Sequence, residues 1–393
     1  MSIRYLTTKI NIPKKGDVII RPARLIDARR IQVLYTEVYG SSYSIPIITD
    51  KEKMKSAIES DDYYWLVGDY NSRIIASLVY SLDLKNRISK AFGAVVSEEF
   101  RKNDIAYIMM KLILDDITQN QNLVDVVYAT TRTTSYAPQK LTESLGFIKL
   151  GIFPNTHKVK ENETHCFTVY LTENALKRRR KEPIIIPEIL PFYEIVLKQI
   201  KLEKPKIKNV KRQYSDHTVK IPIVDFEIIT APFFIKRRFS KVNNKGWFKN
   251  IFMPFHEPNI LLVTPDGKTE IYLTYNPKDK YSVFIGGFTN LDPSVVLESV
   301  SKKMRDLDMA YLEILFDAYT PELQRAAIDA RFIPSGYFVA GKYDNGTRYD
   351  CIIFSRTFDV LDFRNVKLSS IYKEFLKEYL KLWRENYVEV VFR

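Results

Sequence analysis

Hydrophobic and polar positions along the first half of the chain predict a mixed sheet with helices between its strands. Residues 17 to 40 begin as a strand of alternating apolar positions and continue as an amphipathic helix. A second helix is expected over 49 to 61. Two β-rich runs, 63 to 70 and 73 to 82, then form the arms of a hairpin, and 89 to 97 continues as a third antiparallel strand.

The most informative segment is the run from 96 to 116, in which a strand turns directly into an apolar helix expected from about 104 to 119. The next run, 123 to 131, is continuously apolar, as a buried parallel strand would be. A strand-helix-strand crossover of this kind places the turn at the carboxyl ends of the strands, where ligands of open α/β sheets bind.

This turn has the outline of an anion site. The first N–H groups of the helix, from Arg101 to Ile105, have no partner inside the helix and point outward with the positive end of its dipole. Such a turn can hold a pyrophosphate. Asp104 stands where a glycine would let the backbone approach the ligand, and it adds a carboxylate beside the anion. Two readings stay open: Arg101 and Lys102 offset that repulsion, or the site is degraded.

The second half repeats the order of the later elements of the first half. The first half closes with a helix ending at Gly146 and a hairpin. In the second half a strand at 282 to 288, a helix at 292 to 306, a strand at 309 to 317 and a final helix and strand at 321 to 340 are expected. Laying Phe147 on Phe332 also lays Gln139 on Gln324 and Val127 on Leu312, which predicts an internal duplication.

The strand-to-helix turn within 96 to 116 of the first half has no counterpart in the second half. No Arg-x-x-Gly element stands between Phe284 and Leu297, and Asp292 before Pro293 indicates a helix cap. Gly286 and Gly287 leave room for a ligand to contact the backbone. We expect a non-catalytic second unit that completes the sheet or the substrate cleft.

A length of 393 residues predicts two or three domains. We expect a first domain at 1–176, a basic, proline-containing linker with one helix at 177–220, a second domain at 221–363 and a C-terminal docking helix at 364–393. The linker is interpreted as a solvated helix packed between domains. The last helix packs on the core of the chain or on a partner in a homodimer.

Composition narrows the class of protein. The net charge is +13, and 177 to 220 alone holds thirteen Lys or Arg against five Asp or Glu, so the basic excess is local and nucleic acid is not the expected partner. The N-terminus has no apolar signal core and no run predicts a membrane span, which indicates a cytoplasmic protein. Cys166 and Cys351 suggest neither disulfide nor zinc, and His157 and His165 near Cys166 are too few for a tetrahedral site, so no metal is expected.

With these elements in place, the first half resembles the GNAT (GCN5-related) N-acetyltransferases. The resemblance covers roughly residues 17 to 176 and rests on 20 to 31, 96 to 106 and 144 to 154. It implies an α/β fold of tandem GNAT-like units, each a mostly antiparallel sheet with a central parallel pair flanked by helices. The family binds acetyl-CoA in a V-shaped opening between two strands, next to a turn that Arg101, Asp104 and Ala106 match in two of three positions.

The resemblance implies acetyl-CoA as co-substrate and a small-molecule or protein amine as acceptor. The expected cofactor-binding residues belong to the strand, the turn and the following helices: Ala94, Val95, Val96, Arg101, Lys102, Asn103, Asp104, Ile105, Ala106, Ser135 and Gln139.

Direct acetyl transfer needs a base for the ammonium proton and an acid for the departing thiolate. Many members of the family place a Tyr as the acid where this chain has Thr142, a poor acid. Tyr136 is therefore the candidate acid, with half-buried packing as its alternative role. Glu98 is the candidate base through water, with Glu99 beside it, and ordinary solvated carboxylates are the alternative.

The sequence thus predicts an acyl-CoA-dependent N-acyltransferase. A catalytically inactive, CoA-sensing or protein-interaction module on the same scaffold is the second reading, favoured by Asp104 and Thr142. A third is that the basic linker binds RNA, DNA or an acidic carrier, in which case binding weakens steeply with salt.

Overall fold

The computed structural model describes residues 6–40, 43, 45–158, 162–214, 220–242, 248–249 and 255–389. The chain forms two compact units, of which unit 1 comprises Met1–Thr130, Ala137–Phe147 and Thr168–Ala175, and unit 2 comprises Thr131–Tyr136, Ile148–Phe167 and Leu176–Arg393. The fold is mixed α/β, as predicted. No helix in the described ranges has the length and apolar character to cross a bilayer.

The sheet of unit 1 runs in chain order and then turns back. Its strands are β1 (Thr8–Ile12), β2 (Gly16–Pro22), β3 (Tyr63–Tyr70), β4 (Arg73–Asp83), β5 (Ile88–Val96) and β6 (Val126–Arg132), followed by the end of β8 (Asn162–Leu171). Neighbours from β1 to β5 are antiparallel, and β5 with β6 is the parallel pair. The predicted hairpin is β3 with β4, whereas the short edge strand β1 was not predicted.

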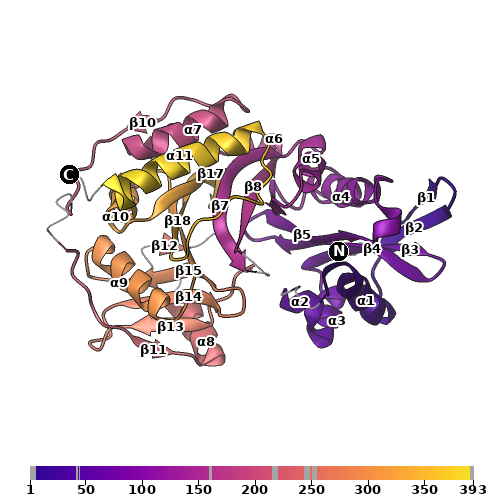
Figure 1. The fold of residues 1–393 in the computed structure, drawn as a ribbon, viewed down its shortest axis with the longest axis horizontal. Coiled ribbons are helices and arrows are strands. Elements are labelled where there is room, and N and C mark those ends of the chain that lie inside the picture. Colours follow the sequence, from indigo (N-terminus) through magenta and orange to yellow (C-terminus); the bar gives the residue numbers. More distant parts are fainter. Residues whose placement is uncertain are drawn as a thin grey trace. The chain divides into compact units, whose positions relative to one another are not determined.

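Helices cover both faces of this sheet (Figure 1). They are α1 (Ala28–Tyr39), α2 (Pro46–Thr49) and α3 (Lys51–Glu59) on one face and α4 (Ile105–Asp115) and α5 (Ala137–Ser144) on the other. Each face has its own apolar core: α1 packs through Ile31 and Leu34 beside Trp65, and α4 packs through Met109 and Ile113 beside Leu66. Alternate residues of β3 thus enter different cores, as the period of a strand requires.

Unit 2 contains a longer sheet. Its strands lie in the order β8, β7 (Ile148–Lys158), β17 (Ile333–Asp344), β18 (Thr347–Thr357), β16 (Tyr311–Asp317), β15 (Tyr281–Phe288), β14 (Glu270–Asn276), β13 (Ile260–Val263) and β11 (Glu227–Ile229), with β12 (Phe248–Lys249) on β15. β15 and β16 are parallel, and β16 is antiparallel to β18.

The helices of unit 2 include the predicted C-terminal helix. They are α7 (Leu190–Leu197), α8 (Pro232–Val242), α9 (Pro293–Asp306), α10 (Pro321–Asp329) and α11 (Ser370–Tyr387), while α6 (Glu173–Lys177) lies at the boundary in the sequence. α11 buries Tyr372, Phe375 and Tyr379 and packs against β7, β17 and α7. Also within unit 2, β9 (Ile184–Ile185) and β10 (Lys206–Ile207) form a separate parallel pair.

The two halves of the chain share an order of elements. β5, α4, β6, α5, β7 and β8 correspond to β15, α9, β16, α10, β17 and β18, and each series begins with a parallel strand pair. β7 meets β17 with Gly151 opposite Gly336, and a Cβ on Gly151 would lie 2.4 Å from the carbonyl oxygen of Ser335. The predicted register also lays Gly151 on Gly336, so the same position of both halves meets at this contact.

Candidate functional site

The turn between β5 and α4 is tightly wound. β5 ends at Val96, the short 3-10 helix η4 (Glu98–Phe100) follows, and Lys102 and Asp104 both adopt positive φ, of 65° and 54°. Position 104 is thus held in the left-handed region that glycine adopts most easily, which explains why a glycine would be expected there. The side chain of Asn103 ties the turn together by donating to the carbonyl oxygens of Phe100 and Arg101, each at 3.1 Å.

The start of α4 is open to an anion. Asp104 is the N-terminal cap residue, yet its carboxylate accepts no capping hydrogen bond from the helix. The first-turn N–H groups, including those of Ile105 and Ala106, have no partner inside the helix. Arg101, Lys102 and Asp104 are all exposed, so two cations and one carboxylate surround these donors. One of the two cations offsets the charge of Asp104, so one positive charge and the positive end of the helix dipole remain to attract an anion.

The equivalent helix of unit 2 is closed by its own cap. The carboxylate of Asp292 accepts hydrogen bonds from the backbone N–H of Ser294 at 2.8 Å and of Val295 at 3.4 Å. The predicted helix cap is therefore confirmed, and it neutralises the donors that are left free in α4. Of the two corresponding helix starts, the one in unit 1 is available to an external anion.

Next to the turn, β5 carries a bulge. Phe92 pairs with Val79 and Val95 pairs with Ser77, so Gly93 and Ala94 together lie opposite the single residue Leu78. Gly93 has a φ of +66°, and a Cβ there would lie 2.8 Å from the hydroxyl oxygen of Tyr35. A bulge of this kind turns backbone groups out of the ladder.

Tyrosines of α1 bind the carbonyl groups of the bulge. The hydroxyl of Tyr35 donates to the carbonyl oxygen of Gly93, and that of Tyr39 donates to Ala94 at 3.4 Å. Tyr35 and Tyr39 lie on one side of the helix, and Tyr43 packs against both rings at centroid distances of 4.8 and 5.0 Å. Burial raises the pKa of Tyr35, so this hydroxyl stays protonated. Sequence reasoning missed these residues, although a glycine inside a strand and tyrosines at spacing four were the available signals.

Beyond the bulge, β5 and β6 separate. Their parallel pairing covers only Ile88 to Ala91 of β5 and Val126 to Ala129 of β6. β5 continues to Val96 and β6 to Arg132, and no other strand among the described residues pairs with β5 on that side. Ala94 is exposed, Val96 is half-buried and Val95 is buried. Two of the three strand positions predicted to bind the cofactor are therefore accessible.

The predicted acid and base residues differ in their surroundings. Glu98 is exposed, whereas Glu99 binds Arg73 at 2.5 Å and Lys15 at 3.3 Å, and these contacts, chiefly that with Arg73, lower its pKa. Tyr136 is 43% exposed and belongs to unit 2, as does Ser135, which is half-buried. Glu99 is thus held by two cations, whereas Glu98 is exposed to solvent.

Two residues of α5 face inward. Gln139 is 1% exposed, and Thr142 is 4% exposed with its hydroxyl donating to the carbonyl oxygen of Gln139 at 3.1 Å. The corresponding Gln324 of α10 is also fully buried and bonds to the backbone of Ile184 and Ile186. Burial at both positions indicates a structural role for these glutamines.

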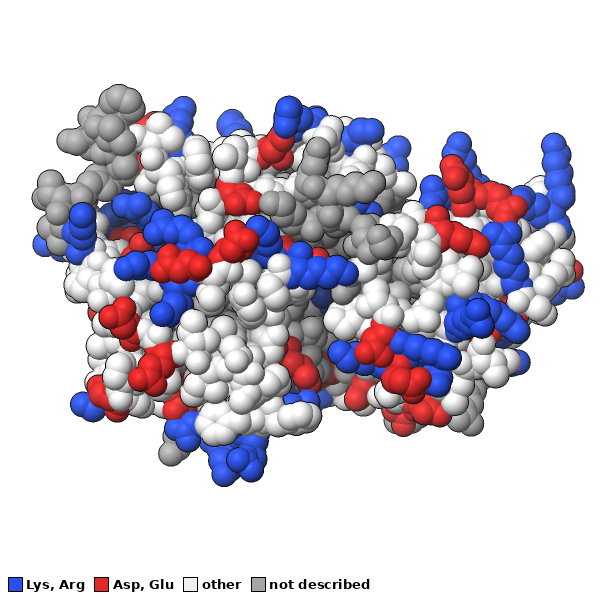
Figure 2. Space-filling model, turned by 60° about the horizontal axis from the view of Figure 1, so that its bottom comes forward, with Lys and Arg blue, Asp and Glu red and all other residues white. Residues whose placement is uncertain are grey.

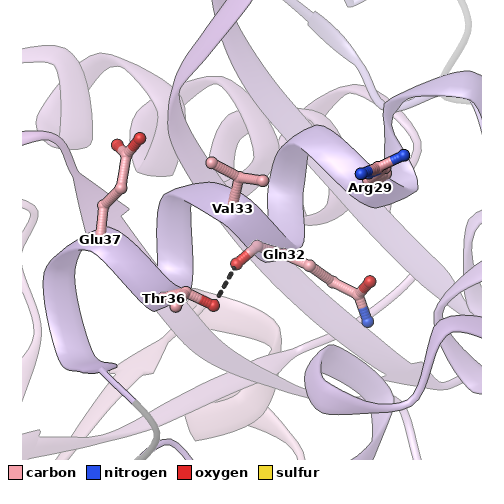
Figure 3. A pocket seen from close by; sticks show the side chains of 5 residues that line it. All are labelled: Arg29, Gln32, Val33, Thr36 and Glu37. Carbon is pink, nitrogen blue, oxygen red and sulfur yellow. Dashed lines mark hydrogen bonds between the residues drawn. The ribbon is translucent and has the colours of Figure 1, made fainter.

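A shallow depression lies along the solvent-facing side of α1 (Figure 3). Arg29, Gln32, Val33, Thr36 and Glu37 line it, and it encloses about 340 Å³. All five residues come from successive turns of one helix, and the hydroxyl of Thr36 donates to the carbonyl oxygen of Gln32 at 2.9 Å. A single helix face offers no converging walls, so this depression lacks the shape of a ligand pocket.

The cysteines and histidines do not assemble a metal site among the described residues. Cys166 and Cys351 are buried, and burial raises the pKa of both thiols. His157 and His165 face each other with ring centroids 4.8 Å apart, and His165 lies 3.5 Å from Glu163. These contacts serve packing and ion pairing in unit 2.

Comparison with known proteins gave matches among solved structures alone, since no family description and no curated protein matches the chain. The ribosomal-protein-S5-alanine acetyltransferase of Vibrio fischeri is 15% identical, covering 42% of this chain and 97% of that one, with a TM-score of 0.36. A GNAT-family acetyltransferase of Streptococcus pneumoniae is 17% identical, covering 39% and 99%, with a TM-score of 0.35. A variant of the spermidine N-acetyltransferase SpeG of Vibrio cholerae is 15% identical, covering 39% and 93%, with a TM-score of 0.35.

Proposed function

We propose that unit 1 is an acyl-CoA-dependent N-acyltransferase that moves an acetyl group from acetyl-CoA to an amine. The observation that carries the proposal is the open start of α4: unpaired amides, a left-handed cap residue without a capping bond, and exposed Arg101 and Lys102. The pyrophosphate of acetyl-CoA has the charge that this turn suits. Its pantetheine arm is an extended amide chain that can bond to those backbone groups of β5 beyond Ala91 that Tyr35, Tyr39 and Arg101 do not already bind.

In this proposal the chain's own residues hold the reactants and move protons. Glu98 accepts, through water, the proton that the acceptor ammonium loses, and the free amine attacks the thioester carbonyl. The C–S bond then breaks as the new amide forms, the attacking nitrogen gives its second proton to water, and the leaving thiolate takes a proton from water. Holding amine and thioester at attack distance accounts for much of the rate.

Titration calorimetry of acetyl-CoA tests the binding half of the proposal. Wild type should bind with micromolar affinity, and Arg101→Ala should weaken binding at least about tenfold, because a charge-assisted contact contributes roughly 1.5–3 kcal/mol. Lys111→Ala is the matched control: it removes one positive charge from the same helix, where Lys111 pairs with Asp115 at 2.7 Å. No heat of binding in the wild type would exclude acetyl-CoA as a ligand.

A second candidate function is a CoA-sensing or protein-interaction module without catalysis. It is favoured by Thr142, whose hydroxyl is buried and engaged inside its own helix, and by the ion-paired state of Glu99. Thiol release from acetyl-CoA, measured against a broad panel of amines, separates the two functions. Release that depends on an added amine supports the transferase, and binding without release supports the sensor.

A further inference from the structure

The parallel strands of unit 2 separate as those of unit 1 do, but the gap between them is filled. β15 and β16 pair from Tyr281 to Val283 and from Tyr311 to Glu313, after which β15 continues to Phe288 and β16 to Asp317. Backbone groups that face such a gap need partners. Within the described chain, β12 provides them.

The position of β12 follows from the neighbours of two glycines. Gly286 and Gly287 pair with Tyr272 and Ile271 of β14 on one side and with Lys249 and Phe248 of β12 on the other. Because a strand has only two edges, β12 lies on the edge that faces β16. β12 therefore occupies the opening between β15 and β16, antiparallel to β15.

Gly287 suits a site for close backbone approach. A Cβ at this position would lie 2.6 Å from the carbonyl oxygen of Glu270 and 2.9 Å from the side chain of Ile271. Position 287 can therefore carry no side chain without displacing residues of β14. The glycines leave room for a backbone contact in the sequence, and a segment of the chain itself makes that contact.

A second observation distinguishes this opening from that of unit 1. The donors at the start of α9 are bound by Asp292, so the anion-binding half of the unit 1 site is absent here. Only the backbone edge of β15 remains to recognise a ligand. An extended peptide backbone satisfies such an edge, with hydrogen bonds that do not depend on charge.

We propose that the opening between β15 and β16 is a peptide-strand site whose occupant is the chain's own segment at residues 248–249. The gap of unit 2 then takes peptide backbone and not acyl-CoA. If unit 1 binds acetyl-CoA as proposed above, one molecule binds per chain. The internal strand closes the second opening by forming the ladder that a ligand would otherwise form.

Hydrogen exchange with mass spectrometry tests the strand without reference to acetyl-CoA. Lys249→Pro removes a backbone donor and disfavours pairing, whereas Lys249→Ala changes the side chain and keeps the donor. Neighbouring residues of a strand point their amides to opposite edges, so one of the amides of Gly286 and Gly287 faces β12 and the other faces β14. We expect one of the two amides to exchange at least about tenfold faster in the proline variant and both to be unchanged in the alanine variant, since tenfold corresponds to about 1.4 kcal/mol. Wild-type exchange in the proline variant would overturn the proposal.

A disulfide test decides the case in which the proline variant unfolds unit 2. Lys249 and Gly286 are directly opposite, so the double variant Lys249→Cys with Gly286→Cys should form a disulfide under mild oxidation. Lys249→Cys with Lys278→Cys is the mispaired control, because Lys278 follows β14 at an exposed position. The proposed strand site would be wrong if the cysteines at 249 and 286 failed to cross-link, or if both pairs cross-linked equally.

Calorimetry then separates the two proposals. One acetyl-CoA per chain supports both, and two per chain overturn the occupied opening of unit 2. No binding at all contradicts the function proposed for unit 1 and leaves the strand site to be judged by exchange and cross-linking.

Discussion

Asp104 combines a carboxylate and a left-handed backbone at one point of the turn, and substitution can separate their effects. Asp104→Asn keeps a side chain that tolerates positive φ and removes the charge, while Asp104→Gly removes the charge and the strain. We expect both variants to bind acetyl-CoA about three- to tenfold more tightly than wild type, because a like charge near the anion costs about 1 kcal/mol at a solvated site. Calorimetry at low salt measures the difference.

The increase in affinity for acetyl-CoA from Asp104→Asn should be smaller at 0.5 M salt, where exposed charges are screened over about 5 Å or less. Tighter binding in Asp104→Gly alone would assign the weakness of the site to backbone strain. Weaker binding in both variants would mean that the carboxylate orders the turn, and the view of Asp104 as a repulsive charge would be wrong.

Glu163 of β8 gives unit 2 a predicted acid sensitivity. Burial alone would raise its pKa, but hydrogen bonds from His165 and Arg132 lower the pKa from 4.5 to about 2. A folded pKa below the unfolded value means that Glu163 stabilises the fold fully above pH 4.5 and loses this contribution as the pH falls toward 2. Arg132 donates from Nε to a carboxylate oxygen of Glu163 at 2.8 Å, so both partners hold the charged form.

Urea unfolding between pH 2.5 and 6 measures this effect. In Glu163→Gln the free energy of unfolding should be lower at pH 6 and should change less than in wild type as the pH is lowered. Glu59→Gln, an exposed carboxylate at the end of α3, is the control and should follow the wild-type profile. Parallel profiles for Glu163→Gln and wild type would show that Glu163 titrates alike in the folded and unfolded chains.

At the scale of elements, local patterns predicted the strand, turn and helix at 96–116 because each depends on neighbours in sequence. The αL conformation of Asp104 was within reach of the same reasoning, since glycine was expected there. Strand β12 was not, because Phe248 and Lys249 become a strand only by pairing with Gly286 and Gly287, far along the chain. Likewise the contacts of Tyr35 and Tyr39 with the bulge of β5 join segments more than fifty residues apart.

The linker at 177–220, called the connector below, shows the same limit of prediction from local sequence. Its basic composition predicted a solvated helix packed between domains. α7 buries Phe192, Tyr193 and Val196, and Gln199 hydrogen-bonds both backbone groups of Lys149 at 2.8 and 2.7 Å. Arg179 is anchored most firmly: its guanidinium donates to the two carboxylate oxygens of Asp350 on β18, at 2.8 and 2.6 Å. Charge composition alone could not show that the carboxylate partner of Arg179 lies on β18.

The Arg179–Asp350 pair fixes the connector to the sheet of unit 2, and its loss should be costly. Both side chains are at most 2% exposed, and Tyr337 also donates to Asp350 at 2.7 Å. Arg179→Ala leaves a buried carboxylate without its main partner and should lower the free energy of unfolding by about 3–5 kcal/mol. Lys181→Ala, two residues along and 75% exposed, should change it by less than about 0.5 kcal/mol. Chemical denaturation compares the two, and equal effects would contradict the anchoring role.

At the scale of the whole molecule, many positively charged side chains lie next to negatively charged ones. On the face shown in Figure 2, basic and acidic side chains lie close together. In the connector, Lys198, Lys206 and Lys208 each bind a glutamate at 2.7 Å or less. Paired cations attract a polyanion less than free ones do, which counts against the third reading, in which the connector binds nucleic acid.

The separate cores of the two units predict a local effect of acetyl-CoA. A ligand that binds the folded form alone, at 100 times its Kd, stabilises that form by about 2.7 kcal/mol. The turn at 97–106 and the first turn of α4 should therefore exchange amide hydrogens more slowly when acetyl-CoA is bound. The exchange of the amides of β14, β15 and α9 should not change, because Asp292 already binds the corresponding donors and β12 already pairs with the corresponding edge.

Exchange measured with and without acetyl-CoA in wild type and Arg101→Ala provides the comparison. Equal protection of both units in the wild type would mean that the openings are alike in function despite their different closure, whereas protection confined to unit 1 and lost in Arg101→Ala would tie it to the turn.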